Sequence, residues 1–309
     1  MTDDTTLLDV ERLALSQEIE VDSHGSANSG DDNAWLSFCL RFLVEVLHDL
    51  RQVRFADLAN EISIKQDGSP VSSIEERIES LCRERLADFD RSASVVGEEQ
   101  GGEIDASGIS LAIDPIDGSW SFVNRDETFA TTLALYRRGQ AELAFAANPA
   151  TGEIAYASIR GRSRLLQLGF SGQADQGYDL PLPQSSKPGL LVNLHPHRQM
   201  GSTMAKLITG WESGGVQLVK AVGGSPVWSM LDAAKGTCTY VNLWPGKPAD
   251  PFDLAAGIII VRGAGGDVVD LSGHPVTMIE HSGPFIAGTE IDNLRRVAEL
   301  IREVAVNGD

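Results

Sequence analysis

Cysteines and long apolar runs are scarce in this chain of 309 residues, and both absences narrow its class. The three cysteines, Cys39, Cys82 and Cys238, are odd in number and widely spaced. They form neither a disulfide framework nor a zinc-binding pattern, and we interpret them as buried free thiols. No apolar run reaches the roughly 20 residues that a membrane-spanning helix needs. We therefore expect a soluble protein without a membrane partner.

Basic residues are also scarce, since 25 Lys and Arg stand against 44 Asp and Glu, a formal net charge of −19. Proteins that bind nucleic-acid polymers need a basic face, which this balance disfavours. A negative balance suits a protein that gathers divalent cations, and an acidic host proteome leaves the same signature. The opening MTDDTTLLDVERLALSQ lacks the basic start and continuous apolar core of an export signal. We therefore expect a cytoplasmic location.

The chain divides into an appendage and two subdomains. Residues 1–33 end in a Ser/Gly/Asp-rich stretch and predict a flexible acidic appendage and linker. From Trp35 to Asn60, and again from Ser72 to Phe89, apolar residues recur at helical spacing and predict two core-facing helices. A loop-like stretch near residue 185 separates an N-terminal subdomain, 34–187, from a C-terminal subdomain, 188–309.

The two subdomains differ in their order of strand-like and helix-like segments. From Ser94 onward, short β-type runs broken by Gly, Asn and Pro predict a sheet. Beyond the boundary, strand-like and helix-like segments alternate and end in a helix from Ile291 to Val306. This alternation is typical of a layered half that mixes α and β elements.

The stretch LAIDPIDGSWSF, residues 111–122, places two aspartates directly after an apolar run. A buried, unpaired carboxylate costs several kcal/mol, so it must stay hydrated, be paired or bind a cation. Pro115 biases Asp114 to an extended conformation, so Asp114 and Asp117 can turn toward one point, with the Ile116 carbonyl between them. Mg²⁺ prefers such oxygen ligands. The segment therefore predicts a cation site.

The residues after Asp117 favour a phosphate site. Gly118 permits a tight bend and close approach of a ligand to its N–H, and Ser119 is predicted to be the N-cap of a following helix. Two further segments, GEEQ at 97–100 and PFDLAAG at 251–257, carry acids beside glycine. Taken alone, an acid beside glycine is more often a turn or a cap than a ligand.

DPIDGSWSF, preceded by VVGEE and followed by FDLAAGIIIVRGAGG, resembles the inositol monophosphatase superfamily of Mg²⁺-dependent, lithium-sensitive phosphatases. KQDGSPVSSIEE resembles the segment between the first two helices of that superfamily, and the likeness runs from about residue 35 to the end. With the alternation above, it implies an α+β fold, a layered αβαβα sandwich of two subdomains. The N-terminal subdomain would hold an antiparallel sheet with paired helices, and the C-terminal subdomain a mixed α/β half.

The resemblance also implies a set of site residues. Two or three Mg²⁺ ions would be held by Glu98, Asp114, Asp117, Asp253 and the Ile116 carbonyl. The N–H groups of Gly118 and Ser119 would hold the phosphate. The implied catalytic residues are Glu98, Ser119 and Asp117, with Glu98 and the Ser119 hydroxyl orienting and deprotonating a water molecule.

Several positions depart from the pattern of the superfamily. Glu75, one methylene longer than the usual aspartate, would form a weaker or displaced third cation site. Phe252 replaces a tryptophan and Ser121 an asparagine. Arg262 and Gly263 stand where an acid is usual, so we expect a structural contact to be missing there.

Three further residues are candidates for substrate binding. Ser225 lies in the GGSPVW turn that opens a helix, and Asn242 lies near the position where inositol-specific enzymes carry an acid. In LHPHRQ, Arg198 is a better candidate than the two histidines, which lack a third ligand for a transition metal.

The favoured function is Mg²⁺-dependent hydrolysis of a small soluble phosphate monoester of an inositol, sugar or amino alcohol. Histidinol phosphatase and 3′(2′),5′-bisphosphate nucleotidase remain open within the superfamily. A regulatory relative that binds metal or phosphate without catalysis is a second hypothesis, and a nucleotide-binding protein built on the glycine-rich turns is a third. Homodimers are common among relatives, and we expect one here.

Overall fold

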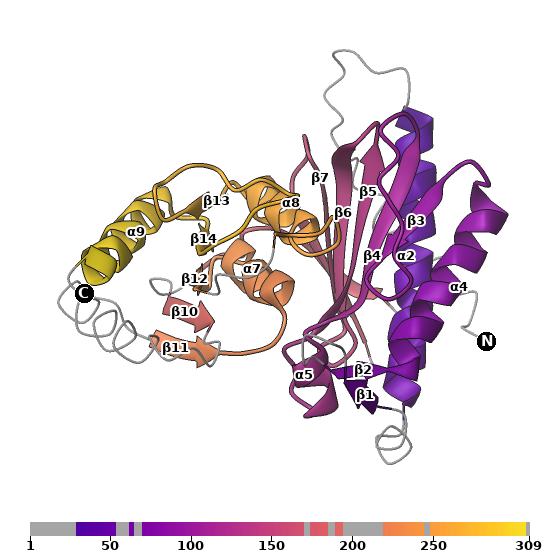
Figure 1. Ribbon diagram of the computed structural model, residues 1–309, viewed down its shortest axis with the longest axis horizontal. Coiled ribbons are helices and arrows are strands. Elements are labelled where there is room, and N and C mark those ends of the chain that lie inside the picture. The colour runs from indigo at the N-terminus through magenta and orange to yellow at the C-terminus, as the bar shows by residue number, and fades with distance from the viewer. Residues whose placement is uncertain are drawn as a thin grey trace.

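Helices and sheets alternate in five layers, and this arrangement confirms the predicted αβαβα sandwich (Figure 1). The computed structural model describes residues 29–53, 62–64, 70–169, 174–184, 189–193, 219–243 and 248–306. Within these ranges, no helix is long and apolar enough to cross a membrane.

The helices of the described ranges are α2 (Ser29–Gln52), α4 (Ser73–Phe89), α5 (Ser119–Val123), α7 (Pro226–Ala234), α8 (Ala255–Gly263) and α9 (Ile291–Val306). The predicted bounds of α4 and α9 agree with these to within one residue. α2 begins five residues before the predicted subdomain start at 34. Acidic residues stabilise the first turn of a helix, and Arg137 lies 2.6 Å from Asp32 and 3.3 Å from Asp31. The predicted continuation toward residue 60 lies outside the described residues from 54 on.

The larger sheet has the order β3-β4-β5-β6-β7-β8-β9. Its strands are β3 (Ser94–Gly97), β4 (Ile109–Asp117), β5 (Ala130–Arg137), β6 (Gln140–Asn148), β7 (Glu153–Ser158), β8 (Arg164–Leu168) and β9 (Ala174–Asp179). Every neighbouring pair is antiparallel except β3 and β4, which are parallel. The predicted antiparallel sheet therefore contains one parallel pair at its edge.

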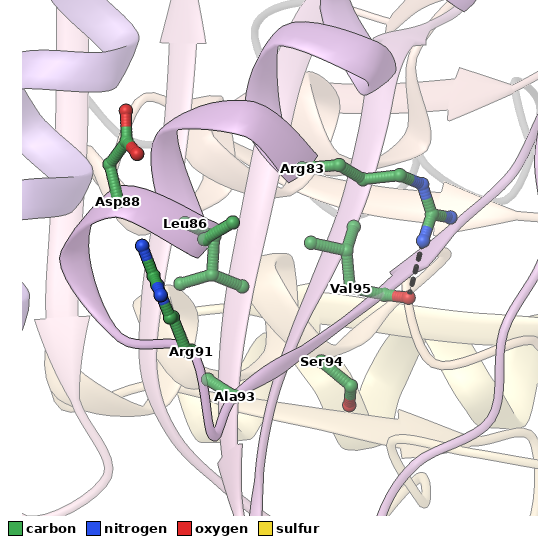
Figure 2. Close-up of a pocket in the computed structure, with 8 residues that line it drawn as sticks. Arg83, Leu86, Asp88, Arg91, Ala93, Ser94 and Val95 are labelled. Atoms are coloured by element: carbon green, nitrogen blue, oxygen red, sulfur yellow. Dashed lines mark hydrogen bonds between the residues drawn. The ribbon is translucent and has the colours of Figure 1, made fainter.

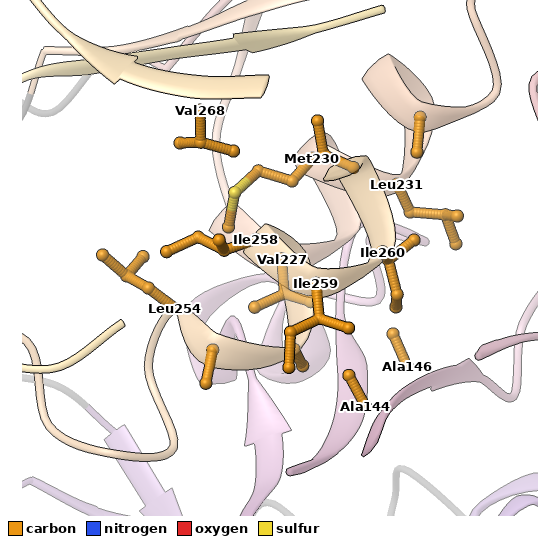
Figure 3. Close-up of a cluster of buried hydrophobic side chains, with 14 of the residues drawn as sticks. Ala144, Ala146, Val227, Met230, Leu231, Leu254, Ile258, Ile259, Ile260 and Val268 are labelled. Atoms are coloured by element: carbon orange, nitrogen blue, oxygen red, sulfur yellow. The ribbon is translucent and has the colours of Figure 1, made fainter. Parts of the chain in front are cut away.

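The two faces of this sheet differ in side-chain size, as β6 illustrates. Leu143 and Phe145 pack in the cluster that α2 and α4 complete. Ala144 and Ala146, on the opposite face, pack against α7 and α8 (Figure 3). Successive strand residues point to opposite faces, so a single strand serves both layers. Small residues on one face let α7 and α8 approach closely.

The smaller sheet has the order β11-β10-β12-β14-β13. Its strands are β10 (Gly189–Asn193), β11 (Val219–Val222), β12 (Cys238–Asn242), β13 (Asp267–Asp270) and β14 (Phe285–Gly288). β10 is parallel to β11 and β12, whereas β14 is antiparallel to β12 and β13, as expected for a mixed half. α9 covers its outer face (Figure 1). Separately, β1 (Ile62–Ile64) pairs antiparallel with β2 (Pro70–Ser72), near α5.

The C-terminal end of α7 is tied to the larger sheet by a buried ion pair. Lys235, 8% exposed, follows α7 and places Nζ 2.9 Å from Glu153 Oε1 of β7. The same Nζ lies 3.3 Å from Asp232 and 4.9 Å from the ring centre of Trp228. A buried charge stays ionised only when such partners compensate it. The two sheets are therefore joined through α7 by charge as well as by apolar packing.

Candidate active site

The two aspartates of DPIDGS lie where β4 leaves its regular pairing with β5. The register shifts between Asp114 and Asp117, and Pro115 lies within this irregularity. Proline lacks an N–H and is tolerated in sheets mainly at edges and bulges. The hydroxyl of Thr131 donates to the Pro115 carbonyl at 2.7 Å, which fixes the bulge from the neighbouring strand. The local sequence therefore places both carboxylates at one irregular strand end.

The turn after Asp117 is formed by Gly118, whose φ of +93° lies in the left-handed region that favours glycine. A Cβ on Gly118 would lie 2.6 Å from the nitrogen of Ser225. Gly118 is the N-cap of α5, so the prediction that Ser119 caps this helix is wrong. The Ser119 hydroxyl donates instead to Glu75 Oε1 at 2.7 Å.

Glu75 reaches the site from the first turn of α4 and is only 1% exposed. Its Oε2 accepts from the backbone nitrogen of Ser72 at 2.5 Å and from the Ser72 hydroxyl at 2.9 Å. Its Oε1 accepts from Ser119. The longer side chain of glutamate therefore bridges the start of α4 and the start of α5. Its role as a metal ligand stays a prediction.

Asp117, in the larger half of the molecule (described residues within 29–184), is held by the smaller half (described residues within 189–306). Its Oδ2 accepts from the Ser225 hydroxyl and, at 3.0 Å, from the backbone nitrogen of Val227. Ser225 also accepts from the nitrogen of Trp228 at 2.7 Å, so it caps α7. Ser225 is fully buried, and its hydroxyl donates to Asp117 while it accepts from the first turn of α7. Ser225, predicted to bind substrate, thus contacts a candidate metal ligand instead.

Asp253 lies in the turn that precedes α8. Its Oδ2 accepts from the Asp250 nitrogen at 2.7 Å, and its own nitrogen donates to the Asp250 carbonyl at 3.0 Å. The Tyr136 hydroxyl, from β5, donates to the Pro251 carbonyl at 2.8 Å. Thr132, also on β5, donates to the Phe252 carbonyl at 3.5 Å. The larger sheet therefore positions the one candidate ligand that comes from the smaller half.

The predicted acids act on one another electrostatically. Burial raises the pKa of Asp114 well above its usual range, and the charges of Glu98, Asp117, Asp253 and Glu75 raise it further, in that order. Burial also raises the pKa of Asp117 to about 7, against the lowering effect of the bonds from Ser225 and Val227. Five carboxylates from four separate segments thus share one region. Their mutual repulsion is the property that a bound cation would relieve.

No group of three or more Asp, Glu, His or Cys side chains in the described ranges has an arrangement that could hold a metal ion. Each candidate aspartate accepts a hydrogen bond from a protein donor, and carboxylates that ligate metals are commonly held by such bonds. The donor set nevertheless fits a hard divalent cation, since it consists of carboxylates near a backbone carbonyl. The excess of buried negative charge fits one as well.

The other predicted residues lie in different environments. Glu98 is half-buried in the turn after β3. Asn242 is buried at the end of β12, between β10 and β14, and its contact with substrate stays a prediction. Arg198 lies outside the described residues. Arg262, where a contact was expected to be missing, lies 3.0 Å from Asp267.

Sequence reasoning missed the residues that hold the acids in place, above all Thr131, Thr132 and Tyr136 of β5. These residues share one segment, ATTLALYR, that is polar at its start within an otherwise apolar strand. Polar residues in a buried strand need hydrogen-bond partners, and this requirement could have indicated that these residues hold neighbouring segments.

The sequence profile of the inositol monophosphatase family matches residues 35–305. A histidinol-phosphatase of Mycobacterium tuberculosis is 30% identical over 239 residues, which cover 75% of this chain and 85% of that protein. An inositol-1-monophosphatase of Rhizobium meliloti is 26% identical over 254 residues, covering 81% and 88%.

Solved structures agree in fold. The IMPase of Thermotoga maritima superposes with a TM-score of 0.69 at 22% identity, over 88% of this chain and 98% of that one. The suhB protein of Bartonella henselae gives 0.67 at 19% identity, over 89% and 99%. The profile match spans the larger sheet, the smaller sheet and every candidate acid. The chain therefore belongs to the inositol monophosphatase family of phosphoric monoester hydrolases.

Proposed function

We propose that the protein is a Mg²⁺-dependent phosphomonoesterase that hydrolyses a small phosphorylated alcohol. The observation that carries this proposal is the electrostatic cluster of five carboxylates around Asp114, beside the turn at Gly118. Carboxylate and carbonyl oxygens suit Mg²⁺, and backbone N–H groups at a tight turn suit a phosphate. Membership of a metal-dependent family supports the same conclusion.

In this proposal the Mg²⁺ ligands are Glu98, Asp114, Asp117, Asp253 and the Ile116 carbonyl. Mg²⁺, when bound, supplies positive charge for the phosphate and makes a water molecule more acidic. The Ser119 hydroxyl donates to Glu75 Oε1, so its oxygen can accept a hydrogen bond from water, and as it takes a proton from water its own hydrogen can pass to the Glu75 carboxylate. Glu75 therefore replaces Glu98 as the proposed partner of Ser119 in activating water.

Histidinol phosphate is a second candidate substrate, beside inositol and sugar phosphates. The similarity to a histidinol-phosphatase favours it, and so does Trp120, which is 57% exposed and directly follows Ser119. An exposed indole can stack on a planar ring, which inositol and sugar phosphates lack. Trp120→Ala should then lower kcat/KM for histidinol phosphate about 2- to 10-fold and leave that for inositol phosphates unchanged.

The test is phosphate release from purified protein over a panel of inositol phosphates, sugar phosphates, histidinol phosphate and bisphosphonucleotides. We expect release that requires Mg²⁺ and stops with a chelator. We also expect lithium to inhibit by competing at one cation position. Folded protein that releases no phosphate from any member of the panel, with or without Mg²⁺, would refute the enzymatic function and favour a regulatory metal-binding relative.

Two further properties stay proposals. We propose that the protein is cytoplasmic and that it forms a homodimer. Cell fractionation tests the first. Sedimentation of the purified chain tests the second.

A further inference from the structure

α4 carries a second buried carboxylate, one helical turn after Glu75. Glu79 has no exposed surface and follows Glu75 by four residues, so both side chains lie on the same face of the helix. Glu75 reaches the start of α5, whereas Glu79 reaches the turn that follows β3. The proposed reaction uses Glu75 and leaves Glu79 without a role.

Glu79 fills the inside of this turn. Its carboxylate accepts from the backbone nitrogen of Glu99 at 2.9 Å and from that of Gln100 at 3.1 and 3.2 Å. The turn is closed by two bonds of 3.1 Å, from the Gly97 nitrogen to the Gly101 carbonyl and from the Gly101 nitrogen to the Gly97 carbonyl. Successive N–H groups that converge on one anion form a compact anion-binding turn.

Arg83 compensates the buried charge of Glu79 and fastens both sides of the turn. Its Nη2 lies 2.6 Å from Glu79 Oε1 and donates to the Gly101 carbonyl at 2.7 Å. Its Nη1 donates to the Val95 carbonyl of β3 at 3.2 Å (Figure 2). Bonds between ionised partners are stronger than neutral ones. The side chains of Glu79 and Arg83 therefore both hold the turn to α4.

The candidate ligand Glu98 lies at the centre of this arrangement. On one side is Gly97, where a Cβ would lie 2.0 Å from the carboxyl carbon of Glu79. On the other side is Glu99, whose nitrogen donates to Glu79. The backbone of Glu98 is thus held at both neighbours by a single side chain, and the charge of its own carboxylate acts on the pKa of Asp114.

We propose that Glu79 is a positioning residue, which holds the Gly97–Gly101 turn so that Glu98 can share a cation with Asp114. The inference rests on the proposed Mg²⁺ dependence. Replacing the Glu79 carboxylate by an amide removes the charge that pairs with Arg83 and puts an NH₂ donor in place of one acceptor oxygen, which loosens the turn. Residues that orient metal ligands typically change metal affinity by 10- to 100-fold, on the order expected here.

The test compares Glu79→Gln with Glu76→Gln in the full-length protein. Glu76 is exposed on the same helix, and it meets the turn through its backbone carbonyl, which accepts from Gln100 Nε2 at 3.1 Å and is retained in the variant. Mg²⁺ and Mn²⁺ binding are measured by isothermal titration calorimetry, and the Mg²⁺-dependent rise in melting temperature is measured in parallel. We expect Glu79→Gln to weaken binding about 10- to 100-fold and Glu76→Gln to leave it unchanged.

A second variant, Glu79→Asp, keeps the negative charge near Arg83 but withdraws the carboxylate from the turn by one methylene. It should also bind the cation more weakly, and it covers the case in which Glu79→Gln does not fold. Folded Glu79 variants with wild-type cation affinity and a lowered melting temperature would overturn the inference and leave the proposed function standing. A wild-type protein whose melting temperature and calorimetric signal do not respond to either cation would overturn both.

Discussion

The larger sheet and the smaller half of the molecule hold the candidate acids in different ways. In the larger half, the donors to Asp114 and Glu75 belong to that same half, since Ile116 donates to Asp114 and both Ser72 and Ser119 donate to Glu75. Across the boundary the donors are distant, since Ser225 binds Asp117 from 108 residues away. The larger half can thus position the side chains of Asp114 and Glu75 by itself. Asp117 receives its bond from Ser225 only when the two halves pack together.

The largest effect should come from the acid that belongs wholly to the larger half. Asp114→Asn keeps the shape of the side chain but removes a ligand charge, so we expect Mg²⁺-dependent phosphate release to fall on the order of 10²- to 10³-fold or more. The fold should persist, because the substitution also removes repulsion among buried carboxylates. Phosphate release and circular dichroism melting measure the two effects. Activity equal to wild type would refute the site.

Ser225→Ala tests the support that crosses the boundary. It removes a donor to Asp117 together with the cap of α7, so cation affinity should fall about 10- to 100-fold and stability by about 1–2 kcal/mol. Ser229→Ala is the matched control, because Ser229 is buried on the same helix and its hydroxyl bonds to the Ser225 carbonyl, at 3.0 Å, and to Tyr240 rather than to a candidate acid. Equal cation affinity in the two variants would show that the halves do not depend on each other.

The cation-free protein should lose stability as the pH rises. Burial raises the pKa of Asp117 to about 7, and that of Asp114 shifts in the same direction, against about 3.9 for an unfolded aspartate. Between these values the folded state binds more protons than the unfolded state, so raising the pH favours unfolding. Above about pH 7 the Asp117 contribution levels off. Urea unfolding at pH 5 and pH 8, with a chelator or with Mg²⁺, measures this.

Added Mg²⁺ should remove most of that pH dependence, because a cation compensates the ionised acids. Stability that is constant or rises between pH 5 and pH 8 in the presence of chelator would contradict the proposed repulsion.

The smallest effect should come from a single bond across the boundary. Tyr136→Phe removes the donor to the Pro251 carbonyl, and we expect a loss of about 1 kcal/mol in the free energy of unfolding. Tyr156→Phe is its control, because the buried Tyr156 hydroxyl has no hydrogen-bond partner within the described ranges. Chemical denaturation of both variants measures the difference. Equal losses would show that the bond at Pro251 adds no stability.

The sequence predicted the elements well where a local pattern determines them. The helical period of α4 and α9 and the DPIDGS motif depend on neighbours within a few residues, so they can be read without the fold. The expected grouping of Glu98, Asp114 and Asp253 came from the family resemblance rather than from spacing.

The partners of the acids could not be read in this way. Ser225 looked like a substrate residue because a Gly-Ser turn opens a helix, yet only the packing of α7 on the larger sheet brings its hydroxyl to Asp117. Ser119 looked like a cap because serine usually caps, but Glu75, 44 residues earlier, competes successfully for its hydroxyl. Such pairings depend on tertiary contacts between distant segments, for which the sequence has no periodic signal.

α7 is fastened to the larger sheet at both of its ends, by Ser225 at the first and by Lys235 just past the last. A helix advances about 1.5 Å and turns about 100° with each residue. The nine residues of α7 therefore determine the distance and the rotation between its two anchors, Ser225 and Lys235. Inserting one alanine would leave the composition of the helix almost unaltered, yet it would put one anchor out of phase with the other.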